Sequence, residues 1–157
     1  MYLLDTDHCS RLIGNDPSIV KKLSELGDAF IATCAIVSGE LIFMAHKSEY
    51  VDQNLQQVSA LLRDIEVLPV DDEAARVYGR LKAAILDKFG PREKAKRRRF
   101  GIDELGFKDN DLWIAAVAKR DGLVVVSADG DFQRLRQVLD VAVEQWCRPD
   151  TDVPPTD

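Results

Sequence analysis

The chain has 157 residues, of which 46% are hydrophobic and 31% charged, and its formal net charge is −6. This length suits one domain with a hydrophobic core, and the composition is typical of a globular protein. The negative net charge argues against a protein that coats nucleic acid nonspecifically, although a local basic patch could still contact RNA. The apolar runs fall well short of the roughly 20 residues that cross a bilayer.

The N-terminus and the cysteines indicate the compartment. The chain enters a short strand pattern at once, without the basic region and cleavage site of a secretion signal. Its three cysteines, Cys9, Cys34 and Cys147, are odd in number and form no CxxC pair. This usage favours reduced thiols over a disulfide framework or a zinc site. We therefore expect a cytoplasmic protein that does not contact a membrane.

Short apolar runs alternate with amphipathic segments along most of the chain. The expected strands are residues 2–4, 29–32, 65–70, 123–126 and 141–144. The expected helices are 9–13, one from Pro17 to Gly27, 34–47 with Thr33 as cap, 52–63, 72–88, one capped by Asn110, and 132–135. Strands separated by helices predict an α/β fold with a central, mainly parallel, twisted sheet of about five strands flanked by helices.

Two segments depart from this pattern. Residues 89–107 form a basic insertion. Before a mixed stretch at 100–107, it has a single acid, Glu93, among the cations Arg92, Lys94, Lys96, Arg97, Arg98 and Arg99. Clustered cations release counterions when they bind phosphates, so Arg97, Arg98 and Arg99 are candidate RNA-binding residues, although a solvated surface loop explains them equally well. Residues 147–157 contain Pro154-Pro155 and are expected to be a disordered tail after a single domain of residues 1–146.

Four acids stand where an apolar run ends or turns helical: Asp5, Glu40, Asp111 and Asp129. Parallel strands end, and the following helices begin, along one edge of a sheet, so these acids could converge in space. Carboxylates 4 Å apart repel by about 4 kcal/mol per pair at an effective dielectric near 20. A cation offsets that repulsion, and hard oxygen ligands favour Mg²⁺ or Mn²⁺. The sequence therefore predicts a metal site at this edge.

Each acid also has an ordinary structural explanation. Asp5 could cap the first helix, and Asp111 suits the positive end of a helix dipole. Asp129 and Asp131 flank a glycine in a turn, where aspartate is common. Glu40 could face solvent, although its helical neighbours are apolar and a buried carboxylate needs a partner. No single acid decides the matter, and the order of the four along the chain carries the argument.

That order is accompanied by five local motifs. They are residues 2–7 (YLLDTD), 36–41 (IVSGEL), 110–116 (NDLWIAA), 125–132 (VVSADGDF) and 143–146 (VEQW). Together they resemble the PIN domain family, and most closely its VapC-type toxins of bacterial and archaeal toxin–antitoxin modules. The NDLWIAA segment is the most specific match. Asn usually stands at the place of Asp7 and Thr at that of Ser127, and the basic insertion is longer than the family's usual connection.

The resemblance implies a function. Asp5, Glu40, Asp111 and Asp129 would form the catalytic, metal-binding cluster, with Thr6, Asn110, Ser127 and Asp131 around it. The reaction would be Mg²⁺- or Mn²⁺-dependent hydrolysis of RNA phosphodiester bonds by an endoribonuclease, which leaves 5′-phosphate and 3′-hydroxyl ends. The RNA would be of the tRNA or rRNA class. The resemblance also implies a homodimer and a cognate antitoxin that covers the acidic groove and inserts a cationic side chain among the carboxylates.

Two other interpretations remain open. A non-catalytic PIN-like module would bind RNA or a protein without cutting, and its RNA binding would not depend on metal. A phosphatase of the haloacid dehalogenase type would use Asp5 as nucleophile, because Asp5-Thr6-Asp7 imitates its Asp-x-Asp motif. That family also needs a lysine motif, and no good match lies between this segment and Ser127. A trapped aspartyl-phosphate would favour the phosphatase.

Overall fold

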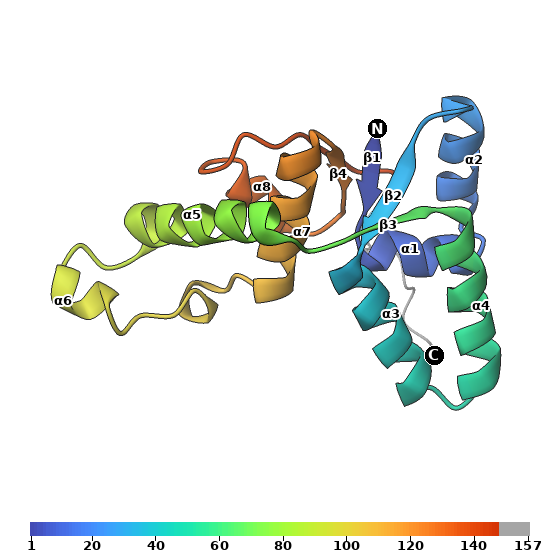
Figure 1. Ribbon diagram of the computed structural model, residues 1–157, viewed down its shortest axis with the longest axis horizontal. Helices are drawn as coiled ribbons and strands as arrows, with labels where there is room; N and C mark the ends of the chain where they lie inside the picture. The colour runs from blue at the N-terminus through green and yellow to red at the C-terminus, as the bar shows by residue number, and fades with distance from the viewer. Residues whose placement is uncertain (148–157) are drawn as a thin grey trace, which may run out of the picture.

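The sheet has five strands in the order β3-β2-β1-β4-β5, and every neighbouring pair is parallel. Figure 1 shows the computed structural model, which describes residues 1–147. The strands are β1 (Tyr2–Leu4), β2 (Ile31–Cys34), β3 (Glu66–Leu68), β4 (Val124–Val126) and β5 (Val143–Glu144). The α/β fold with a parallel five-stranded sheet confirms the fold class predicted from the sequence.

Helices connect the strands and cover the sheet. They are α1 (Thr6–Ile13), α2 (Pro17–Leu26), α3 (Ala35–Lys47), α4 (Val51–Asp64), α5 (Asp72–Phe89), α6 (Lys94–Arg97), the 3-10 helix η1 (Asp103–Leu105), α7 (Asp109–Asp121) and α8 (Gly130–Leu135). Helix α3 packs against α4, and α5 packs against α7 (Figure 1). Within residues 1–147, no helix combines the length and the apolar character that a membrane span requires.

The central strands are apolar because both of their faces are covered. Leu3 and Leu4 of β1 and Val125 and Val126 of β4 are fully buried. Burying one such side chain stabilises the fold by about 1.5–3 kcal/mol. Parallel strands that are covered on both faces therefore have continuous apolar sequences, and the sequence shows this pattern at β1 and β4.

The second strand and its cap differ from the prediction. The strand lies two residues later than expected, because Tyr2 of β1 pairs with Ile31. Thr33 consequently belongs to the strand and does not cap α3. It is buried, and its hydroxyl donates to the carbonyl of Leu4 at 3.0 Å. Its hydroxyl thus joins two strands of the core.

The start of α7 also differs from the prediction. The N-cap position is Lys108, so Asn110 lies in the first turn and does not cap the helix. Its side-chain amide instead donates to Glu40 of α3 at 2.7 Å. The predicted cap is wrong because this residue bonds across the fold and not to its own helix.

The basic insertion projects from the rest of the molecule. Helix α6 lies at the end of α5 that is remote from α1 and α3 (Figure 1). Arg97 forms an ion pair with Asp87 of α5, whereas Arg98 and Arg99 are exposed. The returning chain is anchored by the buried side chains of Ile102 and Phe107.

The predicted tail lies almost entirely outside the described residues. Cys147 is described and buried, with its sulfur 3.3 Å from Nε2 of His8. The packed part of the chain therefore includes Cys147, which lies beyond the boundary expected at residue 146.

Candidate metal centre

The four predicted acids line one groove of about 570 Å³. They come from four different elements: Asp5 follows β1, Glu40 lies on α3, Asp111 on α7, and Asp129 follows β4. The backbone N–H of Asp5 donates to the carbonyl of Val126 at 3.1 Å, which holds the ends of β1 and β4 side by side. The topology thus brings together acids that are far apart in sequence.

The tightest group of carboxylates is Asp111, Asp129 and Asp131. One oxygen from each lies within 4.8 Å of the others. Burial, together with the charges of Asp129, Asp131 and Glu40, raises the pKa of Asp111 to about 7, even though the Lys108 ammonium acts in the opposite direction. Asp131 also pairs with Arg134 at 2.9 Å, so part of its charge is balanced within α8.

Asp5 has two structural partners as well as its place in the groove. Its Oδ1 accepts hydrogen bonds from the backbone N–H of His8 at 2.8 Å, as the N-cap of α1, and lies 2.9 Å from the imidazole Nδ1. Both contacts use Oδ1, and a second oxygen remains for a ligand in the groove.

Glu40 is held from both sides. One carboxylate oxygen accepts from the hydroxyl of Thr6, and the other accepts from the amide of Asn110 at 2.7 Å. The two donors come from α1 and α7, while Glu40 lies on α3. Glu40 is therefore half-buried and oriented by two neighbouring helices, not a free solvent-exposed residue.

Asp129 sits at the junction of β4 and α8. Burial opposes its ionisation, but hydrogen bonds from the backbone N–H of Asp131 and from Lys108 outweigh that effect and lower its pKa. Its own backbone N–H donates to the hydroxyl of Ser127 at 3.0 Å. Ser127 is buried, so it fixes the turn that presents the acid without itself lining the groove.

The residues present fit a hard divalent cation. Asp111 Oδ2 is buried without a hydrogen-bond partner among the described residues. An unpartnered buried carboxylate oxygen is costly unless a cation meets it. The oxygen donors of the cluster are those that Mg²⁺ and Mn²⁺ accept. Asp5, Glu40, Asp111 and Asp129 are thus placed to hold such an ion, and their role as ligands stays a prediction.

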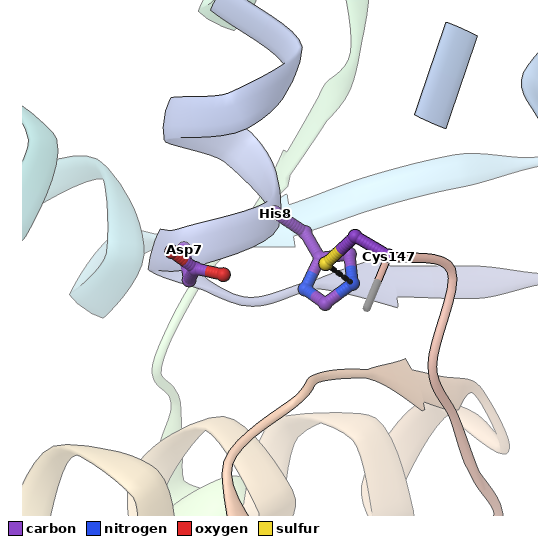
Figure 2. Close-up of side chains that lie close together, drawn as sticks. All are labelled: Asp7, His8 and Cys147. Carbon is purple, nitrogen blue, oxygen red and sulfur yellow. Dashed lines mark hydrogen bonds between the residues drawn. The ribbon is translucent and has the colours of Figure 1, made fainter. Parts of the chain in front are cut away.

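Two residues at this site were missed by the sequence analysis. Lys108 lines the groove and contacts Asp129 Oδ2 at 2.6 Å. His8 is fully buried between Asp5 and Cys147, and Figure 2 shows the Cys147 sulfur against its imidazole ring. The position of His8, three residues after a capping acid, was the available signal, since i and i+3 residues share a helix face.

The predicted RNA-binding arginines lie elsewhere. Arg97, Arg98 and Arg99 belong to the basic insertion, whose helix α6 stands at the far end of α5 (Figure 1). None of the three lines the groove. The structure therefore does not bring them together with the acids, whereas Lys108, at the end of the returning chain, does line the groove.

Comparison with known proteins decides the family, because the PIN domain model matches residues 2–138. The chain belongs to the PIN domain family. This PIN domain is 27% identical over 146 residues to the tRNA(fMet)-specific endonuclease VapC of Salmonella typhimurium, covering 93% of this chain and 98% of the relative. It is 33% identical over 115 residues to ribonuclease VapC5 of Mycobacterium tuberculosis, covering 72% and 74%.

A solved structure supports the same grouping. The PIN domain superposes on the crystal structure of DNA-bound VapBC from Salmonella typhimurium with a TM-score of 0.72 and 28% identity. The match covers 93% of this chain and 98% of that one. The sequence resemblance to VapC-type PIN domains is thereby confirmed over nearly the whole chain.

Proposed function

We propose that this PIN domain is a Mg²⁺- or Mn²⁺-dependent endoribonuclease and the toxin of a toxin–antitoxin pair. The observation that carries the proposal is the buried Oδ2 of Asp111, which has no hydrogen-bond partner within residues 1–147 and lies in a groove lined by four further acids, Asp5, Asp7, Glu40 and Asp129. The ribonuclease and endonuclease names of its VapC relatives support RNA as the substrate. The Salmonella relative is specific for a tRNA by name, so tRNA is the first substrate to test.

The residues of the groove have separate tasks in such a reaction. Asp5, Glu40, Asp111 and Asp129 would hold the ion, and the hydrogen bonds from Thr6 and Asn110 orient Glu40 for that role. A bound Mg²⁺ or Mn²⁺ supplies a water of lowered pKa and offsets charge on the phosphate. Hydrolysis forms a bond from the water oxygen to phosphorus and breaks the P–O3′ bond, and the leaving 3′ oxygen receives a proton. In this proposal the proton from the water is assigned to the carboxylate of Glu40.

An antitoxin is the second part of the proposal. The VapBC assembly of the Salmonella relative supports a protein partner. One wall of the groove carries the exposed apolar side chains of Phe43 and Met44 on α3. Exposed apolar surface beside an acidic groove suits a partner segment that combines apolar and cationic residues. The expected homodimer stays a prediction, which sedimentation equilibrium can test.

The test is cleavage of total tRNA and ribosomal RNA by purified protein with Mg²⁺, with Mn²⁺ and with EDTA. We expect cutting with either metal, none with EDTA, and a loss of at least about 100-fold in Asp5→Asn, because a carboxylate ligand is removed. Asp140→Asn is the matched control, since Asp140 is an exposed aspartate that pairs with Lys119 outside the groove. Circular dichroism checks that each variant folds.

Two results would count against the proposal. Cleavage that persists in EDTA or in the Asp5→Asn variant would contradict the proposed metal site. RNA binding that is equal with and without metal, and never followed by cutting, would favour a non-catalytic module. No observation on Asp5 or Asp7 favours the phosphatase, since Asp5 caps α1 and Asp7 pairs with Arg11 at 2.9 Å.

A further inference from the structure

Lys108 places a positive charge inside the acidic groove. Its Nζ lies 2.6 Å from Asp129 Oδ2, while its side chain is 68% exposed. Among residues 1–147, the cationic side chains that line the groove are Lys108 and Arg11. Arg11 bonds to Asp7 at 2.9 Å and to Asp16 at 3.4 Å. The charge of Lys108 is thus directed at the acidic cluster, and that of Arg11 at acids outside it.

The backbone of Lys108 is fixed although its side chain is exposed. The preceding residue, Phe107, is buried, and its ring lies 3.9 Å from the guanidinium of Arg134. Arg134 also donates to the carbonyl of Leu105 at 2.8 Å. Lys108 then forms the N-cap position of α7, three residues before Asp111. Because the backbone is fixed and the four-carbon side chain is flexible, the Lys108 ammonium can change partners without leaving the groove.

The charges of the groove require a further cation when RNA binds. Asp5, Glu40, Asp111 and Asp129 carry four negative charges when ionised, and one divalent ion offsets two of them. A phosphodiester adds one more negative charge. A nearby ammonium offsets part of this excess and attracts the anionic substrate. Lys108 is the groove cation whose described ion-pair partner is itself a predicted metal ligand.

We propose that Lys108 is a substrate-contacting residue of this centre, which binds an oxygen of the scissile phosphate in the loaded enzyme and is held by Asp129 when ion and RNA are absent. The inference rests on the proposed ribonuclease function and adds a specific residue to it. Positive groups aimed at the transferring phosphoryl group are a common source of rate enhancement. In the unloaded chain, the same ammonium competes with the divalent ion for Asp129 Oδ2.

The two roles predict effects of opposite sign. Removing the charge with Lys108→Gln should slow cleavage, because the phosphate loses a cationic partner. The same change should tighten binding of the ion, because Asp129 loses a competing partner. A residue that merely supported the structure would weaken both properties together. The comparison of the two measurements therefore separates a substrate contact from a structural role.

The experiment measures Mn²⁺ binding by calorimetry and cleavage of total tRNA at saturating Mn²⁺ in the same preparations. For Lys108→Gln we expect about a 100-fold loss of turnover. We expect its Kd for Mn²⁺ to fall about two- to fivefold, the range for an exposed ion pair. Lys108→Arg keeps the charge and should retain most of the turnover. Lys119→Gln is the matched control, because Lys119 forms an exposed ion pair with Asp140 at the other end of α7.

Several outcomes would overturn the inference. Turnover of Lys108→Gln equal to wild type excludes the phosphate contact, and an unchanged or weakened Mn²⁺ affinity excludes the competition. An equal loss of turnover in Lys108→Arg would show that the charge is not what matters. If the wild-type protein itself cuts no RNA, the proposed function fails and this inference fails with it. If only the inference about Lys108 is wrong, the wild-type protein still cleaves RNA.

Discussion

Asp111 is the acid of the groove with the least favourable surroundings for its charge. Burial and the neighbouring carboxylates raise its pKa to about 7, against a usual value near 4 for aspartate. Without a divalent ion, the folded chain therefore keeps a proton on Asp111 under conditions where the unfolded chain has lost it. Between about pH 4 and pH 7 that difference makes folding less favourable as the pH rises.

The Asp111→Asn variant tests this linkage. Asparagine cannot ionise, so the variant should gain stability over wild type as the pH rises from 4.5 to 8. The gain should be on the order of 1–2 kcal/mol after solvent screening of a half-buried group is allowed for. Urea denaturation of both proteins in EDTA at the two pH values measures it. A difference between variant and wild type that does not change with pH would contradict the raised pKa.

The acids themselves could be predicted from the sequence, but their partners could not. Each acid follows an apolar run or begins a helix, and that local pattern is visible in one dimension. The contact between Asn110 and Glu40 joins residues 70 positions apart, so no spacing rule reveals it. Lys108 was missed for the same reason, because its contact with Asp129 spans 21 residues. Local patterns predict which residues can bind, and tertiary contacts decide how they are oriented.

At the scale of elements, the first turn of α7 directs three polar residues to three different places. Asp109 accepts from the hydroxyl of Tyr78 on α5 at 2.7 Å, Asn110 donates to Glu40 on α3, and Asp111 faces the groove. Trp113 stacks on Tyr78 with ring centroids 3.8 Å apart. This stack and the Asp109 contact hold α7 against α5, and they thereby hold the turn that carries Asp111.

The basic insertion lies apart from the acidic groove. Arg98 and Arg99 are exposed at the far end of α5, whereas Arg97 pairs with Asp87. We expect Arg98→Gln/Arg99→Gln to weaken RNA binding and to reduce its salt slope by about 2, one unit for each lost phosphate contact. Filter binding to total tRNA at several salt concentrations measures the slope.

Arg97→Gln provides the comparison within the same insertion. Since Arg97 pairs with Asp87 of α5, its replacement should loosen the insertion locally. It should change the salt slope of RNA binding little. Equal salt slopes for wild type and the Arg98/Arg99 variant would assign the exposed arginines to a solvated surface or a protein contact.

Most elements could be predicted, while boundaries failed where tertiary contacts set them. The second strand was expected at residues 29–32 because that run is short and apolar, but its register is set by the pairing of Tyr2 with Ile31. Propensity carries no information on pairing partners, so a shift of two residues could not be foreseen. Helix starts set by local contacts were predicted better: the helices expected from Pro17 and from residue 72 begin there, where Asp16 and Asp71 accept from N–H groups of their own helices.

At the scale of the whole molecule, a bound ion should act as a clamp between four elements. At ten times the Kd, a ligand that binds only the folded state adds about 1.4 kcal/mol of stability. For a chain of this size, that corresponds to a rise in Tm of about 3–6 °C. Thermal denaturation with and without Mg²⁺, at matched ionic strength and pH 8, measures the shift. An equal shift in Asp5→Asn would mean that the ion acts elsewhere.

The parallel pairing of β1 with β4 places Tyr2 beside Val124. Half of the acids, Asp5 and Glu40, belong to the first third of the chain, and Asp111 and Asp129 belong to the last third. At usual rates of translation, a chain of 157 residues takes about 8–30 s to synthesise. Until residue 129 has been added, the emerging chain lacks Asp129 and cannot complete its groove. The sheet order thus delays completion of the groove until a late stage of synthesis, so an antitoxin that is already present can meet the site as soon as it forms.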